Sequence, residues 1–465
     1  MIYKLIYIIN VVALGYTMLI GIIYLIHLIS AALSLDRYLK SSSYNIYDSF
    51  MKSQNMLPIS ILVPAYNEET TIVDNVKNLL NLDFPEYEVI VVNDGSMDQT
   101  LDVLKKTFSL VKVKQPIRMQ IPTNQVNAVY HSTLYPFLIV IDKVNGSKAD
   151  ALNVGINVSK YPIFVSIDAD SLLEKQSLFK IIMPFAKDHR VVSIGGIVRI
   201  ASGCRVENGE LVDIGLSKKP LVNFQTVEYL RAFLTGRIGF DAMGMLLIVS
   251  GAFGAFKKQE VIEVGGYTRN CIGEDMELTV KLHKSLKDKN KDYKIKFLPD
   301  PVCWTQPPSA YKDLKGQRKR WQIGLIDTLM KHRDMLLNRK YGRIGMLSLP
   351  YFWIFEFIGP IIETLGYIFV FVAYCLKIIN IQFFIGFYVL SVLYGIMLSI
   401  GALMLEEYTF KKYPSIIQLI QLLFYAIIDN FGYRQINTLF KVEALLTYRK
   451  NKHSWGKIKR EKFEN

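Results

Sequence analysis

Residues 5–35 contain no Asp, Glu, Lys or Arg, and this uncharged run constrains the fold more than any other feature of the chain. About 20 apolar residues suffice for a helix to cross the hydrocarbon core of a bilayer. The run is also too long for the apolar core of a cleaved signal peptide. We therefore predict an uncleaved transmembrane helix within residues 1–45. Arg37 and Lys40 follow the run, and because basic residues favour the cytoplasmic flank of a membrane helix, the next domain is expected in the cytoplasm.

A second apolar region begins after about residue 341 and consists of residues 347–376, 378–405 and a weaker stretch at 413–428. Glu356 and Glu363 interrupt the first stretch, so part of it is expected to lie along the bilayer surface. Three crossings would place the basic C-terminal tail outside the cell, whereas two crossings and an interfacial last helix would keep it inside. The bias of basic residues toward the cytoplasm favours the second arrangement, and the sequence leaves both open.

These observations divide the chain into four predicted parts: a transmembrane helix at 1–45, a cytoplasmic globular domain at 46–340, interfacial and transmembrane helices at 341–442, and a basic tail at 443–465. The chain is thus expected to be a multi-pass protein of the plasma (inner) membrane, with the lipid bilayer as a partner.

The net charge of +14 arises from 55 Lys and Arg against 41 Asp and Glu. Such an excess occurs in nucleic-acid-binding proteins. Here much of it flanks the apolar stretches, for example at Lys331, Arg339 and Lys411, which fits an anionic bilayer face better. We therefore expect no nucleic-acid partner. The four cysteines have neither metal-ligand nor paired spacing and are predicted to be free thiols in a reducing compartment.

The globular domain alternates apolar strand-like runs with helical patterns. This alternation predicts an α/β fold, similar to the Rossmann class, with a mainly parallel sheet and helices on both faces. Ligands bind beyond the carboxyl ends of the strands in such sheets. The predicted strands lie within 59–69, 87–96, 136–143 and 162–171, and the predicted helices within 70–82, 98–108 and 147–159.

Polar side chains occupy the predicted strand ends, whereas the chain has neither a G-x-G-x-x-G turn after the first strand nor a P-loop lysine. In an extended backbone Asp168 and Asp170 point to the same side, so both carboxylates can share one Mg²⁺ or Mn²⁺ with diphosphate oxygens. A D-x-D sequence alone is more often a turn or a cap, but its place after an apolar strand favours the metal site. The strand-end residues are Tyr66, Asn67, Glu68, Asn93, Asp94, Asp168 and Asp170.

Glu274 and Asp275 open a predicted helix in "GEDMELTVKLH". Acids in a first turn complement the helix dipole, which is the simpler interpretation. The alternative is a general base, because joining an alcohol to a sugar carbon requires that the hydroxyl lose its proton. Upstream, Gly251 in "VSGAFG" permits close approach of the backbone to a bulky ligand.

The sequence "KGQRKRWQIG" precedes the second apolar region. A basic, aromatic membrane flank would account for it. In a sugar-transfer site Arg320 would offer a planar fork to phosphate, Trp321 a flat face to a sugar, and Gln317 a hydrogen bond to sugar or phosphate. The acidic motifs that precede it in the chain favour this second interpretation.

As a set, these motifs resemble those of the processive family 2 glycosyltransferases, the group of cellulose, hyaluronan, chitin and poly-N-acetylglucosamine synthases. The resemblance covers roughly residues 57–335. Its four elements are Asp94 in "NDGS", "DAD" at 168–170, "GED" at 273–275 and "QRKRW" at 317–321. It implies a GT-A fold inserted between membrane helices, a UDP-sugar donor, inversion at the anomeric carbon, and export of the growing polysaccharide acceptor through the protein's own helices.

The resemblance also implies a role for each matching residue. Asp168 and Asp170 would bind the metal, with Asp168 also at the diphosphate. Asp275 would be the base, with Glu274 beside it. The remaining donor residues would be Tyr66, Glu68, Asp94, Lys148, Gln317 and Arg320, and the acceptor residues Trp321, Ser250 and Gly251.

The motif set leaves the donor open. The run "GEDMELTVKLH" is most similar to bacterial glucan synthases, which predicts UDP-glucose and a cellulose-like or mixed-linkage β-glucan. A UDP-N-acetylglucosamine polymer, of the poly-N-acetylglucosamine, hyaluronan or chitin type, is the alternative. Transfer of one sugar to a lipid phosphate is disfavoured because acceptor stacking serves elongation, and a non-catalytic membrane transporter or scaffold is disfavoured by the intact acidic set.

Overall fold

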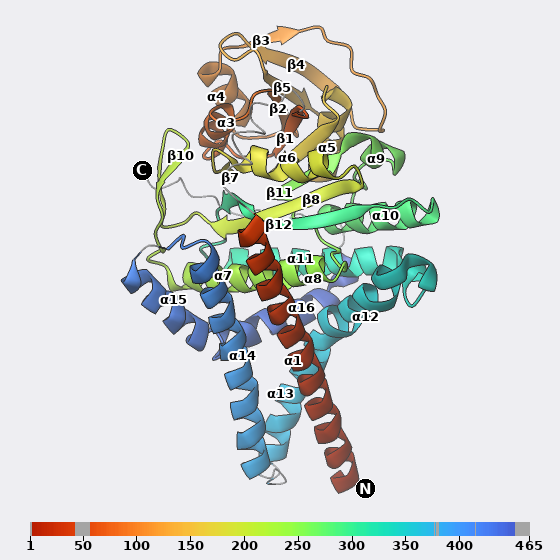
Figure 1. Cartoon of the computed structure of the whole chain (residues 1–465), viewed down its shortest axis with the longest axis vertical. Coiled ribbons are helices and arrows are strands. Elements are labelled where there is room, and N and C mark those ends of the chain that lie inside the picture. The colour runs from red at the N-terminus through yellow and green to blue at the C-terminus, as the bar shows by residue number, and fades with distance from the viewer. Residues whose placement is uncertain (1, 42–55, 376, 378–380, 414, 452–465) are drawn as a thin grey trace.

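The computed structural model describes residues 2–41, 56–375, 377, 381–413 and 415–451. An α/β body lies at one end, and α1 (Ile2–Ser41), α13 (Gly359–Cys375) and α14 (Ile381–Thr409) extend from it in a common direction (Figure 1). The body contains the predicted globular domain, and the extended helices contain most of the apolar runs of the sequence.

The body is built on a ten-stranded sheet with the order β3-β4-β5-β2-β1-β6-β11-β8-β12-β7. Its strands are β1 (Ile59–Ala65), β2 (Tyr87–Asn93), β3 (Leu110–Val113), β4 (Val126–Ser132), β5 (Leu138–Lys143), β6 (Ile163–Ile167), β7 (Ser171–Leu173), β8 (Val191–Ile200), β11 (Phe253–Lys257) and β12 (Lys294–Thr305). A separate hairpin pairs β9 (Arg205–Glu207) with β10 (Glu210–Asp213).

The helices of the body are α3 (Ile72–Leu80), α4 (Thr100–Thr107), α5 (Lys148–Val158), α6 (Ser177–Lys187), α7 (Pro220–Leu230), α8 (Ile238–Ala242), α9 (Lys258–Glu263), α10 (Glu274–Asp288) and α11 (Tyr311–Lys331). A π-helical turn, η1 (Arg231–Arg237), joins α7 to α8. The predicted strands coincide with β1, β2, β5 and β6, and the predicted helices with α3, α4 and α5. Helix α3 buries Ile72, Val76, Leu79 and Leu80, the apolar positions that its helical spacing predicts.

The prediction of a mainly parallel sheet is wrong for the sheet as a whole. Strands β5, β2, β1 and β6 pair in parallel, as do β8 and β12. Strand β11 is antiparallel to both β6 and β8, and antiparallel pairs also form at the two edges. Periodicity identifies a strand but not its direction, so the mixed second half of the sheet could not be read from the apolar runs.

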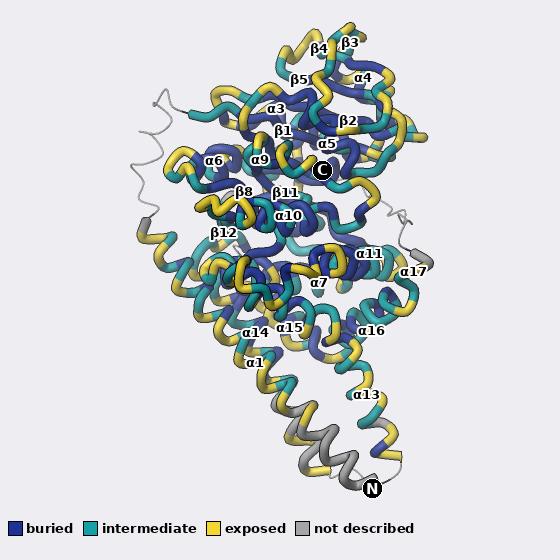
Figure 2. Tube along the Cα trace, turned by 90° about the vertical axis from the view of Figure 1, so that its right-hand side faces the viewer, coloured by how far each residue is buried: buried dark blue, intermediate teal, exposed yellow. Residues whose placement is uncertain are grey.

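The side chains of the long helices are more exposed than those of the sheet. Figure 2 shows a mostly buried sheet region, whereas the long helices carry exposed residues along their length. Large apolar side chains are among them, including Ile22, Leu365 and Leu393. Among the residues that the structure describes, three helical segments are long and apolar enough to cross a membrane: Gly15–Lys40, Ile344–Cys375 and Ser391–Thr409.

The last apolar stretch forms α15 (Ile416–Ile428), which meets α16 (Tyr433–Leu446) at a bend of 56°. Both helices lie crosswise beneath the body, with α15 against α7 and α16 against α11 (Figure 1). The bent pair also meets the length and composition of a fourth span, so both predicted arrangements of the C-terminal helices stay predictions. Helix α16 and the short α17 (Tyr448–Asn451) continue into the predicted tail, and residues 452–465 lie outside the described residues.

Candidate functional site

The carboxyl ends of the central parallel strands lie together, as predicted, and carry the proposed donor residues. Tyr66 and Glu68 follow β1, and Asp94 follows β2. Asp94 is buried, and its Oδ1 accepts hydrogen bonds from the ammonium of Lys143 and from the backbone N–H of Gly146, the latter at 3.0 Å. Burial raises the pKa of Asp94, and the bonds to Lys143 and Gly146 oppose this shift.

Lys148, the first residue of α5, brings three separate motifs together. Its ammonium lies 2.5 Å from Oδ1 of Asp168 and 3.4 Å from Oε1 of Glu274, and it donates to the carbonyl of Gly251 at 3.4 Å. Burial of the ammonium works against its charge, but Asp168 and Glu274 outweigh it and raise the pKa of Lys148. The lysine is therefore held as a cation between the D-x-D and GED motifs.

Asp275 lies against the loop that contains Gly251. Its Oδ2 accepts a hydrogen bond from the backbone N–H of Gly251 at 3.0 Å, and its Oδ1 accepts one from the N–H of Met276 at 2.8 Å. A Cβ at position 251 would lie 2.9 Å from the Lys148 ammonium and 3.5 Å from the Asp275 Cβ. The missing side chain at position 251 therefore lets the loop approach both charged groups closely.

Glu274 points toward Lys148 and is buried. Burial raises the pKa of Glu274 to about 7, and the positive charge of Lys148 only partly opposes this shift. Its carboxylate contacts the Lys148 ammonium, and the catalytic role predicted for Glu274 stays a prediction.

Asp168 and Asp170 both line the same cavity, as a shared metal site requires. Asp170 is almost fully buried, and its Oδ1 accepts hydrogen bonds from Ser171 at 3.2 Å and Thr305 at 3.4 Å. Within the described ranges, no three His, Cys, Asp or Glu side chains form a group that could hold a metal ion. The two hard oxygen donors fit Mg²⁺ or Mn²⁺, with other ligands to come from a diphosphate.

Helices α10 and α11 approach each other at two glycines, and Asp275 and Trp321, which follow and precede these glycines in the chain, line the same cavity. A Cβ on Gly324 would lie 2.7 Å from the Cα of Gly273, and a Cβ on Gly273 would lie 2.8 Å from the Cα of Gly324. Real Cβ atoms do not approach backbone atoms this closely, so both positions require glycine at this separation.

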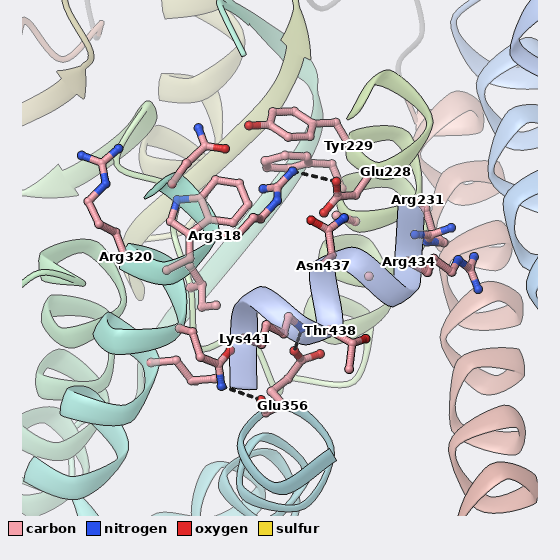
Figure 3. Close-up of a pocket in the computed structure, with 18 of the residues that line it drawn as sticks. Glu228, Tyr229, Arg231, Arg318, Arg320, Glu356, Arg434, Asn437, Thr438 and Lys441 are labelled. Atoms are coloured by element: carbon pink, nitrogen blue, oxygen red, sulfur yellow. Dashed lines mark hydrogen bonds and ion pairs between the residues drawn. The ribbon is translucent and has the colours of Figure 1, made fainter. Parts of the chain in front are cut away.

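Trp321 is half-exposed to the cavity, with 51% of its surface accessible. The Tyr229 ring centroid lies 6.4 Å from that of Trp321, and the Arg318 guanidinium carbon lies 4.2 Å from the indole centroid. In Figure 3, Arg318 points toward Glu228, while Arg320 points away from Arg318 and Glu228. Arg318 and Arg320 therefore lie in different surroundings, and the sequence motif alone does not distinguish them.

One cavity of about 2150 Å³ connects these groups. Tyr66, Asp94 and Asp168 line its upper part, and Tyr367 on α13 and Tyr388 on α14 line its lower part. The cavity contains all predicted site residues, including Ser250, Gln317 and Arg320. Their common location is an observation of the structure, while their individual roles stay predictions.

Some residues that line the cavity, or that contact its lining residues, were not among those predicted from the sequence. Lys143 is fully buried and lies 2.9 Å from Asp150 as well as beside Asp94. Glu228 and Tyr433, from α7 and α16, meet at Arg318. A lysine at the end of an apolar strand was a usable signal for Lys143, whereas no local pattern marks Glu228 or Tyr433.

Residues 163–404 match the family model "Glycosyl transferase family group 2", and residues 60–226 match "Glycosyl transferase family 2". The first match spans more than half of the chain, which therefore belongs to the family 2 glycosyltransferases. This finding confirms the resemblance drawn from the four motifs and identifies the chain as an enzyme of the glycosyltransferase class.

Among its relatives are two poly-beta-1,6-N-acetyl-D-glucosamine synthases. The protein from Staphylococcus epidermidis is 28% identical over 298 residues, which cover 64% of this chain and 61% of that protein. The protein from Staphylococcus aureus (strain COL) is 29% identical over 295 residues, covering 63% and 60%. The matched region thus spans about three fifths of the length of these relatives.

A mannosyltransferase from Pyrobaculum calidifontis, solved in complex with GDP-Man and Mn²⁺, has a similar structure. The TM-score is 0.54 at 16% sequence identity, and the alignment covers 95% of this chain and 98% of that chain. At this identity the likeness concerns the fold alone, and it confirms the predicted α/β GT-A fold.

Proposed function

We propose that the protein is a membrane-integrated, processive, inverting glycosyltransferase that polymerises N-acetylglucosamine from UDP-N-acetylglucosamine. The observation that carries this proposal is the single cavity that joins the acidic strand ends, Asp275 and Trp321 to the apolar helices. The two synthase relatives favour this donor over UDP-glucose, so the β-glucan expectation is replaced by its alternative.

At the donor end, Tyr66, Glu68 and Asp94 would hold the uridine, and Lys148 and Asp168 the diphosphate. Asp168 and Asp170 would hold a divalent cation, whose charge assists departure of the diphosphate. Arg320 and Gln317 would contact the same leaving group or its sugar. The Mn²⁺ in the mannosyltransferase complex supports a divalent cation of this kind.

At the acceptor end, the terminal sugar would stack on Trp321 with one hydroxyl directed at the donor C1 near Ser250 and Gly251. The hydroxyl oxygen forms a bond to C1 as the bond from C1 to the diphosphate oxygen breaks, which inverts the anomeric carbon. The Asp275 carboxylate takes the hydroxyl proton. UDP and a chain longer by one sugar are the products.

The polymer would leave along the lower cavity between α1, α13, α14 and α16. This route implies membrane crossings by the long apolar segments, a cytoplasmic domain at 46–340, and interfacial and channel helices at 341–442. The protein would therefore reside in the plasma (inner) membrane with the bilayer as its partner, and it would need no nucleic acid.

The deciding experiment supplies the purified protein, in detergent and with Mg²⁺ or Mn²⁺, with UDP-N-acetylglucosamine and UDP-glucose separately. We expect polymer from the first donor, and a hydrolase specific for β-1,6-linked N-acetylglucosamine should degrade it. A polymer formed only from UDP-glucose would contradict UDP-N-acetylglucosamine as the donor. Transfer of a single sugar to a lipid phosphate would contradict processivity, and a transporter or scaffold would consume neither donor.

A further inference from the structure

Helix α5 carries a row of buried polar side chains to which the proposed reaction gives no role. Asp150, Asn153 and Asn157 are three and four residues apart, so they lie on one face of the helix. Asp150 is fully buried, and the two asparagines are nearly so. Because a buried polar group is costly unless it is bonded, the partners of this row show which segments the helix holds.

The two asparagines hold two segments from distant parts of the chain. Asn157 accepts a hydrogen bond from the backbone N–H of Ile121 at 3.0 Å and donates one to the carbonyl of Ile121 at 2.8 Å. Asn153 accepts from the N–H of Tyr267 at 2.8 Å and donates to its carbonyl at 2.9 Å. Ile121 lies between β3 and β4, and Tyr267 lies in the loop that leads to α10 and Asp275.

Asp150 connects these two segments to the donor end of the cavity. Its Oδ2 lies 2.9 Å from Nζ of Lys143, and the same ammonium donates to Asp94. Its Oδ1 lies 2.9 Å from Nε of Arg269, in the loop before α10, and its carboxylate accepts from the N–H of Asn124 at 3.1 Å. Alternating charges thus run from Arg269 to Asp94, which lines the cavity.

A second path joins the same two ends. The Arg269 guanidinium also donates to Oδ1 of Asn124, whose Nδ2 donates to the carbonyl of Asn145 at 2.9 Å. The Nδ2 of Asn145 donates to the carbonyl of Asp94 at 2.8 Å. Asn145 and Asp94 line the cavity, whereas Arg269 and Asp150 do not. Any influence of Arg269 on a bound donor must therefore pass through these contacts.

Arg269 is the accessible end of this network. Its side chain is 41% exposed, whereas those of Lys143 and Asp150 are fully buried. The positive charges of Arg269 and Lys143 balance the negative charges of Asp94 and Asp150. Removing the Arg269 charge would therefore leave an excess negative charge behind the donor end, where a diphosphate is expected.

We propose that Arg269 and Asp150 are positioning residues that fasten the loop before α10 to the donor end of the cavity. The inference rests on the proposed function and adds to it a link between the donor residues at the sheet edge and the loop that leads to Asp275. A site that is ordered in advance binds its ligand more tightly, because less of the binding free energy goes into ordering it.

The test compares Arg269→Gln with Arg190→Gln in the full-length protein. Arg190 is a matched control because its side chain is 37% exposed and pairs with Asp188 at 2.9 Å and Asp292 at 3.2 Å, outside the cavity lining. The Kd of UDP with Mg²⁺, the KM for UDP-N-acetylglucosamine, kcat and the melting temperature are measured for each variant. Because Arg269 is partly exposed, we expect its loss to raise Kd and KM by about three- to tenfold, with little change in kcat.

A pair that only stabilises the fold would lower the melting temperature and leave Kd and KM unchanged. Values of Kd and KM equal to those of Arg190→Gln would therefore overturn the proposal. Arg269→Lys keeps the charge beside Asp150 but loses the planar fork that also reaches Asn124, so its Kd should be intermediate.

A double-mutant cycle tests whether Arg269 acts through Asp150. Asp150→Asn removes a buried charge and should raise the Kd of UDP by about ten- to a hundred-fold. In that background Arg269→Gln should change Kd by less than it does in the wild type, and additive effects would overturn the proposal. If Asp150→Asn does not fold, the comparison of Arg269→Gln with Arg190→Gln decides alone.

The two proposals fail in different ways. Wild-type protein that binds UDP but transfers no sugar from any UDP-sugar would contradict the proposed function, while the Kd of UDP would still test Arg269. Transfer by the wild type together with an unchanged Kd and KM in Arg269→Gln would overturn only the positioning role.

Discussion

The two halves of the cavity differ in which parts of the chain their ion pairs join. At the donor half, Asp94 is bonded to Lys143, and Lys148 lies between Asp168 and Glu274. At the acceptor half, Arg318 on α11 pairs with Glu228 on α7, which also accepts a hydrogen bond from Tyr433 on α16. The donor half is thus held by ion pairs between strand ends and the loops and helices that follow them, whereas the acceptor half is held by contacts among helices far apart in the chain.

The largest expected effect is the loss of sugar transfer when the cation site of the donor half is disrupted. Removing divalent cations with EDTA should abolish sugar transfer, and Mg²⁺ or Mn²⁺ should restore it, because two carboxylates alone leave the diphosphate charge uncompensated. Asp170→Asn should also abolish transfer in a folded protein. Undiminished turnover in EDTA would contradict the assignment of Asp168 and Asp170.

The next effect concerns the junction between the halves, where Asp275 lies. Asp275→Asn should lower kcat by about two to four orders of magnitude, the usual contribution of general acid–base catalysis, while UDP binding stays near that of the wild type. Asp288→Asn, at the other end of α10, is the matched control because Asp288 pairs with Lys340 at the surface. Joint loss of UDP binding and turnover would show that Asp275 serves donor binding or structure.

The third prediction concerns a substitution that moves α11 away from α10 and changes no polar side chain. In Gly324→Ala the new Cβ meets the backbone of Gly273, so α11 must move away from α10. A misplacement of about 1 Å can cost about a hundred-fold in rate, and we expect a loss in kcat/KM of about that size.

Gly316→Ala is the control for this experiment, because it lies on the same helix and its Cβ would meet nothing within 4 Å. That variant should retain activity and gain thermal stability, since alanine stabilises a helix interior relative to glycine by about 0.5–1 kcal/mol. Equal activities of the two alanine variants would contradict the role of the glycine contact.

The smallest expected effect is a pH dependence that originates at Glu274. Its pKa is raised to about 7, so below that pH the side chain is neutral and Lys148 loses one of its two carboxylate partners. We therefore expect kcat/KM for the UDP-sugar to rise as the pH increases through about 7, and Glu274→Gln to remove this inflection. An unchanged inflection in the variant would assign it to another group.

The sign for stability is opposite to that for activity. Because the folded protein favours the neutral form of Glu274, the stabilising contribution is complete below the ordinary value of 4.5 and is lost as the pH rises through about 7. The melting temperature, measured across this range for wild type and Glu274→Gln, checks this sign.

The same division explains what the sequence could predict. Asp94 and Asp168 follow strands whose apolar runs are recognisable, so their meeting at one sheet edge followed from the parallel arrangement of β1, β2 and β6. The contact of Glu228, Arg318 and Tyr433 joins three helices far apart in the chain. Such a contact arises only from tertiary packing, and no periodic pattern in the sequence predicts it.

The glycine pair and the sheet illustrate the same limit. Gly273 was visible in the GED motif and Gly324 after the tryptophan, but neither position reveals that the two backbones touch. Similarly, β11 was not among the predicted strands, and its antiparallel insertion between β6 and β8 depends on pairing partners distant in sequence.

If the two halves of the cavity serve one elongation reaction, Trp321→Leu should uncouple donor cleavage from chain growth. The measurement is polymer length and free UDP, side by side, for the wild type and the variant in detergent with UDP-N-acetylglucosamine. Water needs no stacking platform, so we expect short or absent polymer and a larger share of UDP from hydrolysis. Full-length polymer at the wild-type rate would show that Trp321 is no acceptor platform and that "QRKRW" is only a basic, aromatic membrane flank.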